Sequence, residues 1–161
     1  MKRKSQRRFA REKVLQALYA FQLNGEGLTK QTDAMLLDIH SDNDRAFGRR
    51  LINSVAANSV ELNGKIEEKV SNWEVERIAV IDKILLKMGI AEILYFEDIP
   101  PKVSINEVID MAKEYSSANS GKFINGILDA ILTDLKKSGK LNKIGRGLID
   151  KKMTAESNEG T

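Results

Sequence analysis

The chain has 161 residues and no cysteine, which excludes disulfide bridges, thiolate nucleophiles and cysteine-ligated metal centres. Its length fits one domain, and 42% hydrophobic with 30% charged residues argues against wholesale disorder. No apolar run is long enough to span a bilayer and the basic N-terminus lacks the apolar stretch of a secretory signal, so we expect a cytoplasmic protein.

The net charge of +3 is distributed unevenly along the chain. Residues 1–13 hold seven basic side chains and one acidic one, and residues 136–152 hold the same balance. The intervening segment 14–135 carries twelve basic and nineteen acidic residues. Clustered Lys and Arg bind polyanions by displacing counterions from phosphates, whereas basic termini can also simply keep a protein soluble. Charge alone leaves both interpretations open.

Apolar residues recur at spacings of three and four throughout the chain, which predicts an all-α fold. The first helix is expected over residues 7–23, ending at Asn24-Gly25. A short helix over 33–39 and a longer one over 42–62 follow. Asn63-Gly64 is expected to interrupt the chain before a further turn or two.

The most apolar segment, 77–96, predicts a central buried helix. Ser71 and Glu74 before it have the spacing of a capping box, in which a hydroxyl and a carboxylate satisfy each other's unpaired backbone N–H groups. The pair Pro100-Pro101 is expected to end this helix.

Two further helices are predicted in the C-terminal half. Ser104 and Glu107 form a second capping box at the start of one, the polar stretch 116–121 predicts a loop, and the last helix continues to about Leu135. Beyond it the apolar period fades and glycines appear. We therefore divide the chain into one helical domain, 1–138, and a basic, then polar, flexible tail, 139–161.

The sequence offers no catalytic constellation. It has no phosphate-binding loop and no nucleophile elbow. The single histidine, His40, stands beside Ser41 and Asp42 in an expected loop, where consecutive side chains point in different directions. We expect a protein that is not an enzyme and that needs no metal or cofactor.

The first helix carries one candidate binding surface. Beside its buried stripe, a band holds Arg8, Arg11, Leu15 and Tyr19. Arginine can fork onto phosphate and tyrosine can stack on an unpaired base, which suits RNA. The alternative is that Leu15 and Tyr19 pack against a neighbouring helix while the arginines stay solvated.

Ser120-Gly121-Lys122-Phe123 is the second candidate. A helix N-terminus offers unpaired N–H groups to a phosphate, Gly121 allows close approach, and Phe123 could stack on a base. The alternative is an ordinary helix cap with a phenylalanine that packs at the edge of the core.

Several ordered segments resemble those of one known family. They are residues 7–23, residues 81–85 and 92–96 of the central helix, and residues 100–107, 112–113 and 122–129. Together they resemble the NusB family of bacterial transcription antitermination factors. The resemblance covers 7–23 and 77–136, while 26–70 agree mainly in helical pattern and the tail beyond Gly139 is longer than usual.

The resemblance implies about six to seven helices in two small packed bundles. It also implies binding to the boxA element of nascent ribosomal-operon RNA together with NusE, a small-subunit ribosomal protein, in an RNA polymerase elongation complex with other Nus factors. The positions that it assigns to the RNA surface are Arg7, Arg8, Arg11, Tyr19, Lys122 and Phe123. It implicates Tyr19 and Asp82 in contact with RNA or NusE.

Two alternatives and one departure accompany this expectation. The chain could be a protein-interaction module whose acidic body binds a basic partner, with RNA contact incidental. The fold also serves as an RNA-binding accessory domain of ribosomal RNA cytosine methyltransferases, but no catalytic part of such an enzyme is visible in this sequence. Asn119 stands where some family members have an acidic residue, and losing that charge should ease the approach of RNA.

Overall fold

The computed structural model describes residues 5–149 of the chain, the side chains at positions 29, 31, 72 and 73 excepted. Within these residues the fold is all-α, as predicted, with eight α-helices and one short 3-10 helix, η1. No helix in this range is both long and apolar enough to cross a membrane. The elements are α1 (Gln6–Asn24), α2 (Leu28–Leu36), α3 (Asp42–Ala57), α4 (Ser59–Glu67), α5 (Asn72–Arg77), α6 (Val80–Tyr95), α7 (Pro101–Tyr115), α8 (Ala118–Ser138) and η1 (Gly145–Leu148).

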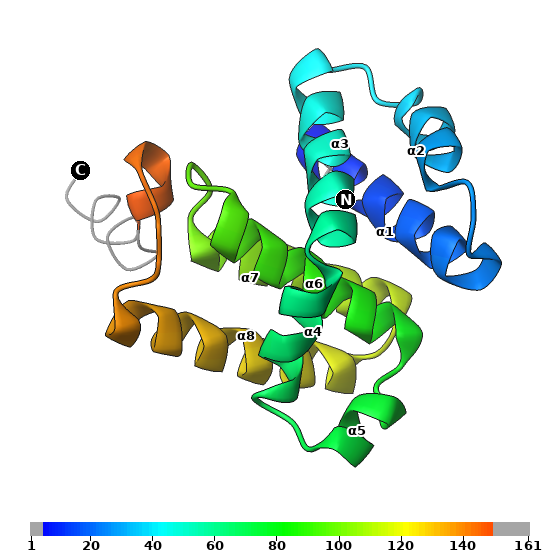
Figure 1. Cartoon of the computed structure of the whole chain (residues 1–161). Helices are drawn as coiled ribbons and strands as arrows, with labels where there is room; N and C mark the ends of the chain where they lie inside the picture. Colours follow the sequence, from blue (N-terminus) through cyan, green and yellow to red (C-terminus); the bar gives the residue numbers. More distant parts are fainter. Residues whose placement is uncertain (1–4, 150–161) are drawn as a thin grey trace.

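The helices form two packed bundles that meet on α6 (Figure 1). Helices α1, α2 and α3 pack against one another, and α6, α7 and α8 form the second group with α4 against α6. Helix α6 touches both bundles because its apolar residues surround most of its circumference. Gly89 of α6 lets Leu128 of α8 and Val108 of α7 approach its backbone closely, since a Cβ there would lie 2.9 Å from Leu128.

In the N-terminal half, two helix boundaries differ from the predicted ones. The chain bends at Asn58, between α3 and α4, and the expected break at Asn63-Gly64 is instead the interior of α4. The Ser71–Glu74 capping pair forms, with the Ser71 N–H donating to Glu74 Oε2 at 3.2 Å, but it opens the separate short helix α5. The central helix begins only at Val80, after a break at 78–79.

The starts of α7 and α8 also differ from expectation. Helix α7 begins at Pro101, because the fixed φ of proline suits the first turn. Ser104 is not its cap but is buried, with its hydroxyl donating to Glu92. The expected loop 116–121 is mostly the first turn of α8, since the Ser117 hydroxyl accepts from the Ser120 N–H at 3.0 Å and caps the helix.

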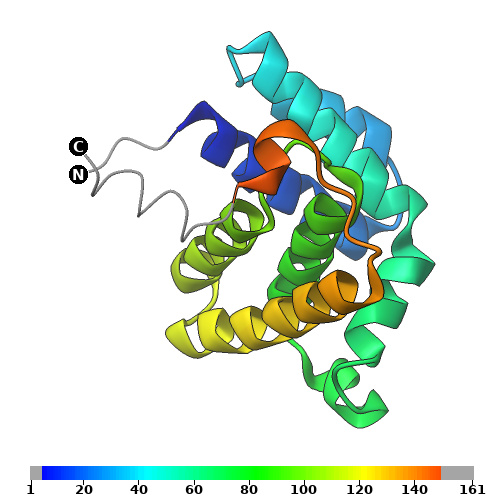
Figure 2. The ribbon, with the colours of Figure 1, turned by 90° about the vertical axis from the view of Figure 1, so that its left-hand side faces the viewer.

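Residues 139–149, which we call the C-terminal strap, return across the end of α6 (Figure 2). Lys143 Nζ donates to the backbone carbonyls of Glu92, at 3.0 Å, and Phe96, at 2.6 Å, and the Ile144 N–H donates to the Glu97 carbonyl at 3.0 Å. The expectation of a flexible tail from residue 139 is therefore wrong for 139–149, because the ammonium group and the Ile144 N–H bind backbone carbonyls at and just beyond the end of α6. The rest of the expected tail, 150–161, lies outside the described residues.

Candidate nucleic-acid interface

The first turns of α1 place Arg7 and Arg8 at the surface in existing ion pairs. Arg7 Nε donates to Asp44 Oδ1 at 2.8 Å, and its guanidinium lies 4.2 Å from the centre of the Phe47 ring. The Arg8 side chain binds two carboxylates of α7, Glu107 and, at 3.2 Å, Asp110. A phosphate would therefore have to share or replace these carboxylates.

Arg11 is the one predicted RNA-binding residue that the structure places in the interior. It is 2% exposed and donates two hydrogen bonds to Glu92, of 2.9 and 2.7 Å. Burial by itself would lower the pKa of the Arg11 guanidinium, but the charge of Glu92 and its hydrogen bonds outweigh it and the pKa is raised. The expectation that Arg11 contacts RNA is corrected: its helical angle faces a buried carboxylate, and it acts as a structural residue.

Tyr19 lies on the same side of α1 as Arg8. Eleven residues at 100° each bring the two side chains to within about 20° of one another around the helix axis. The tyrosine is 38% exposed. One end of this side of α1 thus presents a guanidinium and the other a phenol.

Phe123 lies at the start of α8, beside a hollow of about 530 Å³ that is also lined by Asp82, Arg77 and Asn119. The ring is 37% exposed, so one part of it packs while the other meets solvent. Lys122 next to it is exposed and has no ion-pair partner within the described part of the chain. A partly fixed ring beside an unpaired ammonium group can stack on a base and attract its phosphate.

Asp82 is a largely buried residue that lines this hollow. It is 7% exposed, and its Oδ2 accepts a hydrogen bond of 2.7 Å from the Ser120 hydroxyl. Its Oδ1 is buried and has no hydrogen-bond donor among the described residues. Neighbouring atoms cover this oxygen, so a ligand in the hollow does not reach it in this arrangement.

Gly121 has a different role from the one expected. A Cβ at this position would lie 3.3 Å from Lys113 Cγ and 3.5 Å from Ile109, both on α7. The glycine therefore lets α8 lie close to α7, and the structure gives it no opening toward a phosphate.

Helix α7 connects the two groups of candidate residues. Arg8 contacts Asp110 of α7, and Gly121, next to Lys122, contacts Lys113 one turn further along the same helix. Arg8 therefore lies at one edge of the surface along α7, and Lys122, next to Gly121, lies at the other. The carboxylates of Glu107 and Asp110 stand at the arginine edge, so the surface alternates in charge. Sequence reasoning missed these partners, because helical spacing does not reveal which side chains a second helix supplies.

Residues 5–149 form a two-bundle all-α fold that presents basic and aromatic side chains at its surface, which is the arrangement of a helical binding protein. Comparison with known proteins narrows this class. A family model described as the NusB family matches residues 8–133. The chain belongs to the NusB family.

Similar proteins support this assignment. The transcription antitermination protein NusB of Salinibacter ruber is 45% identical over 148 residues, which are 90% of this chain and 92% of that protein. The protein of the same name from Chloroherpeton thalassium is 44% identical over 146 residues, 89% of this chain and 69% of that protein. Both are named for antitermination and not for a reaction, in agreement with the expectation that this chain is not an enzyme.

Solved structures share the fold. NusB of T. maritima superposes with a TM-score of 0.74 at 32% identity, over 83% of this chain and 94% of that one. A NusB crystallised with NusE and double-stranded RNA superposes with a TM-score of 0.73 over 80% of this chain and 97% of that one. At 24% identity the second likeness concerns the fold alone.

Proposed function

We propose that this protein binds the boxA element of nascent ribosomal-operon RNA together with NusE and so promotes processive transcription. It would act in the cytoplasm, as part of an RNA polymerase elongation complex with other Nus factors. Membership of the NusB family supports this proposal, as does the crystallisation of a protein of this fold with NusE and RNA. The chain would act by binding and positioning, without turnover.

The observation that carries the proposal is the half-exposed Phe123 ring beside the Asp82 carboxylate. Phe123 would stack on an unpaired base, and Lys122 would contact the phosphate next to it. Asp82, which lines the same hollow, would contact RNA or NusE. At the other edge Arg7 and Arg8 would contact phosphates, and Tyr19 would contact RNA or NusE. Arg11 would support this edge through Glu92 without touching RNA.

The charge distribution supports a cooperative mechanism. The acidic central segment would attract a basic ribosomal protein, and the joined surface would hold RNA more tightly than either protein alone. The Arg8 guanidinium is already paired with the carboxylates of Glu107 and Asp110, so this chain alone should bind RNA only weakly.

The proposal is tested by titrating labelled boxA RNA with the protein, with and without NusE, at several salt concentrations. Phe123→Leu keeps an apolar side chain but removes the ring, and it should weaken RNA binding by at least about fivefold, the loss expected for one stacked base. The affinity should fall steeply with salt and rise when NusE is present.

An unchanged RNA affinity in Phe123→Leu and Arg8→Ala, with NusE binding intact, would favour the protein-interaction module instead. RNA binding that is indifferent to both NusE and the boxA sequence would point to the accessory-domain alternative. Lys122→Ala should weaken RNA binding by removing a phosphate contact. Lys136→Ala is its matched control, since both lysines are exposed on α8 and only Lys122 adjoins Phe123.

A further inference from the structure

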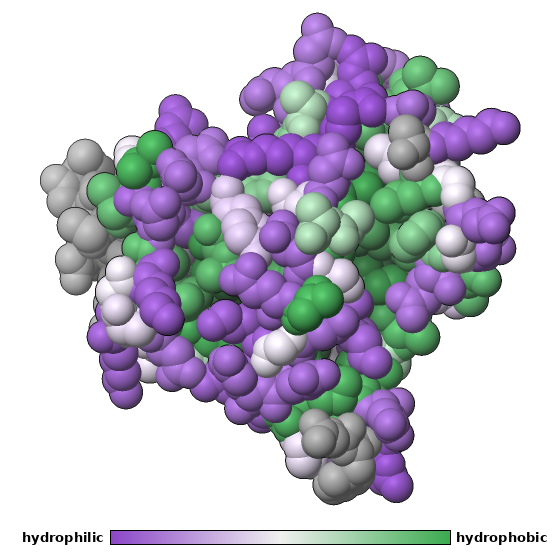
Figure 3. Space-filling model, viewed as in Figure 1, coloured by the Kyte–Doolittle hydropathy of each residue, from purple (hydrophilic) through white to green (hydrophobic). Residues whose placement is uncertain are grey.

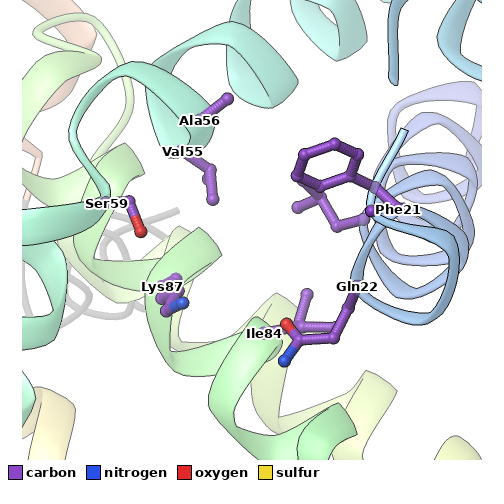
Figure 4. Close-up of a pocket in the computed structure, with 9 residues that line it drawn as sticks. Phe21, Gln22, Val55, Ala56, Ser59, Ile84 and Lys87 are labelled. Atoms are coloured by element: carbon purple, nitrogen blue, oxygen red, sulfur yellow. The ribbon is translucent and has the colours of Figure 1, made fainter. Parts of the chain in front are cut away.

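A second cavity, of about 370 Å³, lies where the two bundles meet, and Figure 4 shows it in close-up. Helix α1 supplies one wall, the end of α3 with the first residue of α4 the opposite wall, and α6 the floor. Its volume falls within the usual range of sites for small molecules. The residues that define it are Leu18, Phe21, Val55, Ala56, Ile84 and Lys87.

The walls of this cavity are mainly apolar. In Figure 4 the ring of Phe21 faces Val55 and Ala56 across the open space, with Ile84 and Lys87 on the side of α6. Figure 3, in the same view as Figure 1, shows hydrophobic surface exposed in the area between α1, α3 and α6. A hydrocarbon group placed there would release water from apolar surface.

Among the residues that the structure describes, Lys87 is the only charged one that lines the cavity. It is half-buried and has no hydrogen bond or ion pair with any residue that the structure describes. Lys83, one turn earlier on α6, likewise has no acidic partner among the described residues. Burial, and after it the charge of Lys83, lowers the pKa of Lys87. An anion beside Lys87 would relieve both effects.

We propose that this cavity binds a small amphipathic carboxylate, with its hydrocarbon part between Phe21 and Val55 and its carboxylate on Lys87. Lys83 adds attraction for the negative charge, and within residues 5–149 no acidic side chain lines the cavity to oppose it. Ser59, at the start of α4, offers a hydroxyl as a second polar contact. An apolar cavity with one unpaired cation selects an anion with an apolar body over either an apolar molecule or a hydrophilic ion.

This site is separate from the candidate nucleic-acid interface. Lys87 follows Asp82 by five residues on α6, which places the two side chains about 140° apart around the helix axis. Phe21 and Tyr19 are separated by about 160° on α1 for the same reason. The inference therefore does not depend on the proposed RNA function, and a failure of either leaves the other standing.

The test is a titration of the full chain, uniformly labelled with nitrogen-15, in which octanoate is the probe and amide resonances are followed by NMR. Octan-1-ol, with the same chain and no charge, is the matched control ligand. Octanoate should produce saturable shifts at amides around the cavity, and octan-1-ol should bind more weakly. Lys87→Met should weaken octanoate binding by about tenfold, as expected for a lost charge-assisted contact, and leave octan-1-ol binding unchanged.

Two more variants complete the design. Ala56→Phe places a ring in the cavity and should abolish binding of both probes, while Lys136→Met removes an exposed lysine that does not line the cavity and should change neither. The inference is overturned if octanoate gives no saturable shifts at millimolar concentration. It is also overturned if octanoate and octan-1-ol bind equally well, or if octanoate binds Lys87→Met as tightly as the parent protein.

Discussion

Arg11 of α1 and Glu92 of α6 join the two bundles through a buried ion pair with two hydrogen bonds, of 2.9 and 2.7 Å. The Ser104 hydroxyl of α7 donates to the same carboxylate at 2.8 Å. One acidic side chain thus connects three helices. Arg8, three residues before Arg11, contacts the neighbouring Glu107 at the surface, so the candidate interface begins where this internal network ends.

Removing one partner of this pair should destabilise the protein strongly. Arg11→Ala leaves Glu92 buried without its cation, and the free energy of unfolding should fall by about 3–5 kcal/mol. The double variant Arg11→Met, Glu92→Met replaces both charges with apolar groups and should cost less than Arg11→Ala alone. Urea denaturation followed by circular dichroism measures both. A loss below about 1 kcal/mol in Arg11→Ala would contradict a structural role for this pair.

If Arg8 binds RNA as proposed, Asp110 competes with RNA for its guanidinium, and removing the charge of Asp110 should strengthen RNA binding. Asp110→Asn leaves Glu107 as the one charged partner of Arg8 among the described residues and removes a negative charge from the interface. We expect RNA affinity to rise about two- to fivefold, the range for one exposed charge. Fluorescence anisotropy with labelled boxA RNA measures the change. Asp134→Asn, which removes an exposed carboxylate paired with Lys69 near the far end of α8, is the matched control and should have no effect.

The apolar period predicted the first helix well, because 7–23 is a long amphipathic segment that ends at glycine, and the observed helix is Gln6–Asn24. It did not predict the surroundings of Arg11. A helical angle gives the side on which a residue lies but not what the next helix presents there. A usable signal was present: Glu92 is an isolated carboxylate inside the most apolar helix, and a buried acid needs a cation.

The predicted starts of α7 and α8 were wrong where a local sequence pattern conflicted with the packing of the helices. Ser104 has the spacing of a helix cap, but the helix already begins at Pro101. The Ser104 hydroxyl instead donates a hydrogen bond to Glu92. The stretch 116–121 is rich in loop-forming residues, yet Ser117 caps a helix that packs closely on α7 through Gly121. At the candidate site, the exposure of Phe123 agrees with its predicted place at the edge of the core. The contact between Ser120 and Asp82 joins residues 38 apart in sequence, which no local pattern indicates.

Because of Lys143, the free energy of unfolding should depend on pH in the alkaline range. Burial lowers its pKa in the folded protein to about 8, from an ordinary value of 10.5. Between these two values the unfolded chain binds more protons than the folded one, so the free energy of unfolding rises as the pH increases from about 8 to 10.5. Lys143→Met lacks this titration. The difference in unfolding free energy between the parent protein and Lys143→Met should therefore increase across this window.

Chemical denaturation at a series of pH values tests this prediction. Lys140→Met is a suitable control, since Lys140 is an exposed lysine of the same strap and its variant should keep the pH dependence of the parent protein. A difference between the parent protein and Lys143→Met that stays constant, or shrinks, as the pH rises would show that the ammonium group is not desolvated on α6.

Gly147 fixes the end of the strap, and even one methyl group should release it. The glycine lies so close to Glu97 that an added Cβ would be 1.9 Å from the Glu97 carbonyl oxygen, a backbone atom that cannot rotate away. Gly147→Ala should therefore detach the strap locally and speed hydrogen exchange of the Ile144 amide, which donates to that same carbonyl. Gly126→Ala, in α8 with nothing within 4 Å of the added Cβ, should not affect this amide.

Since α8 ends before the strap begins, its helical amides should keep their protection in Gly147→Ala. A slow Ile144 amide in Gly147→Ala would mean that the strap is held by Lys143 alone.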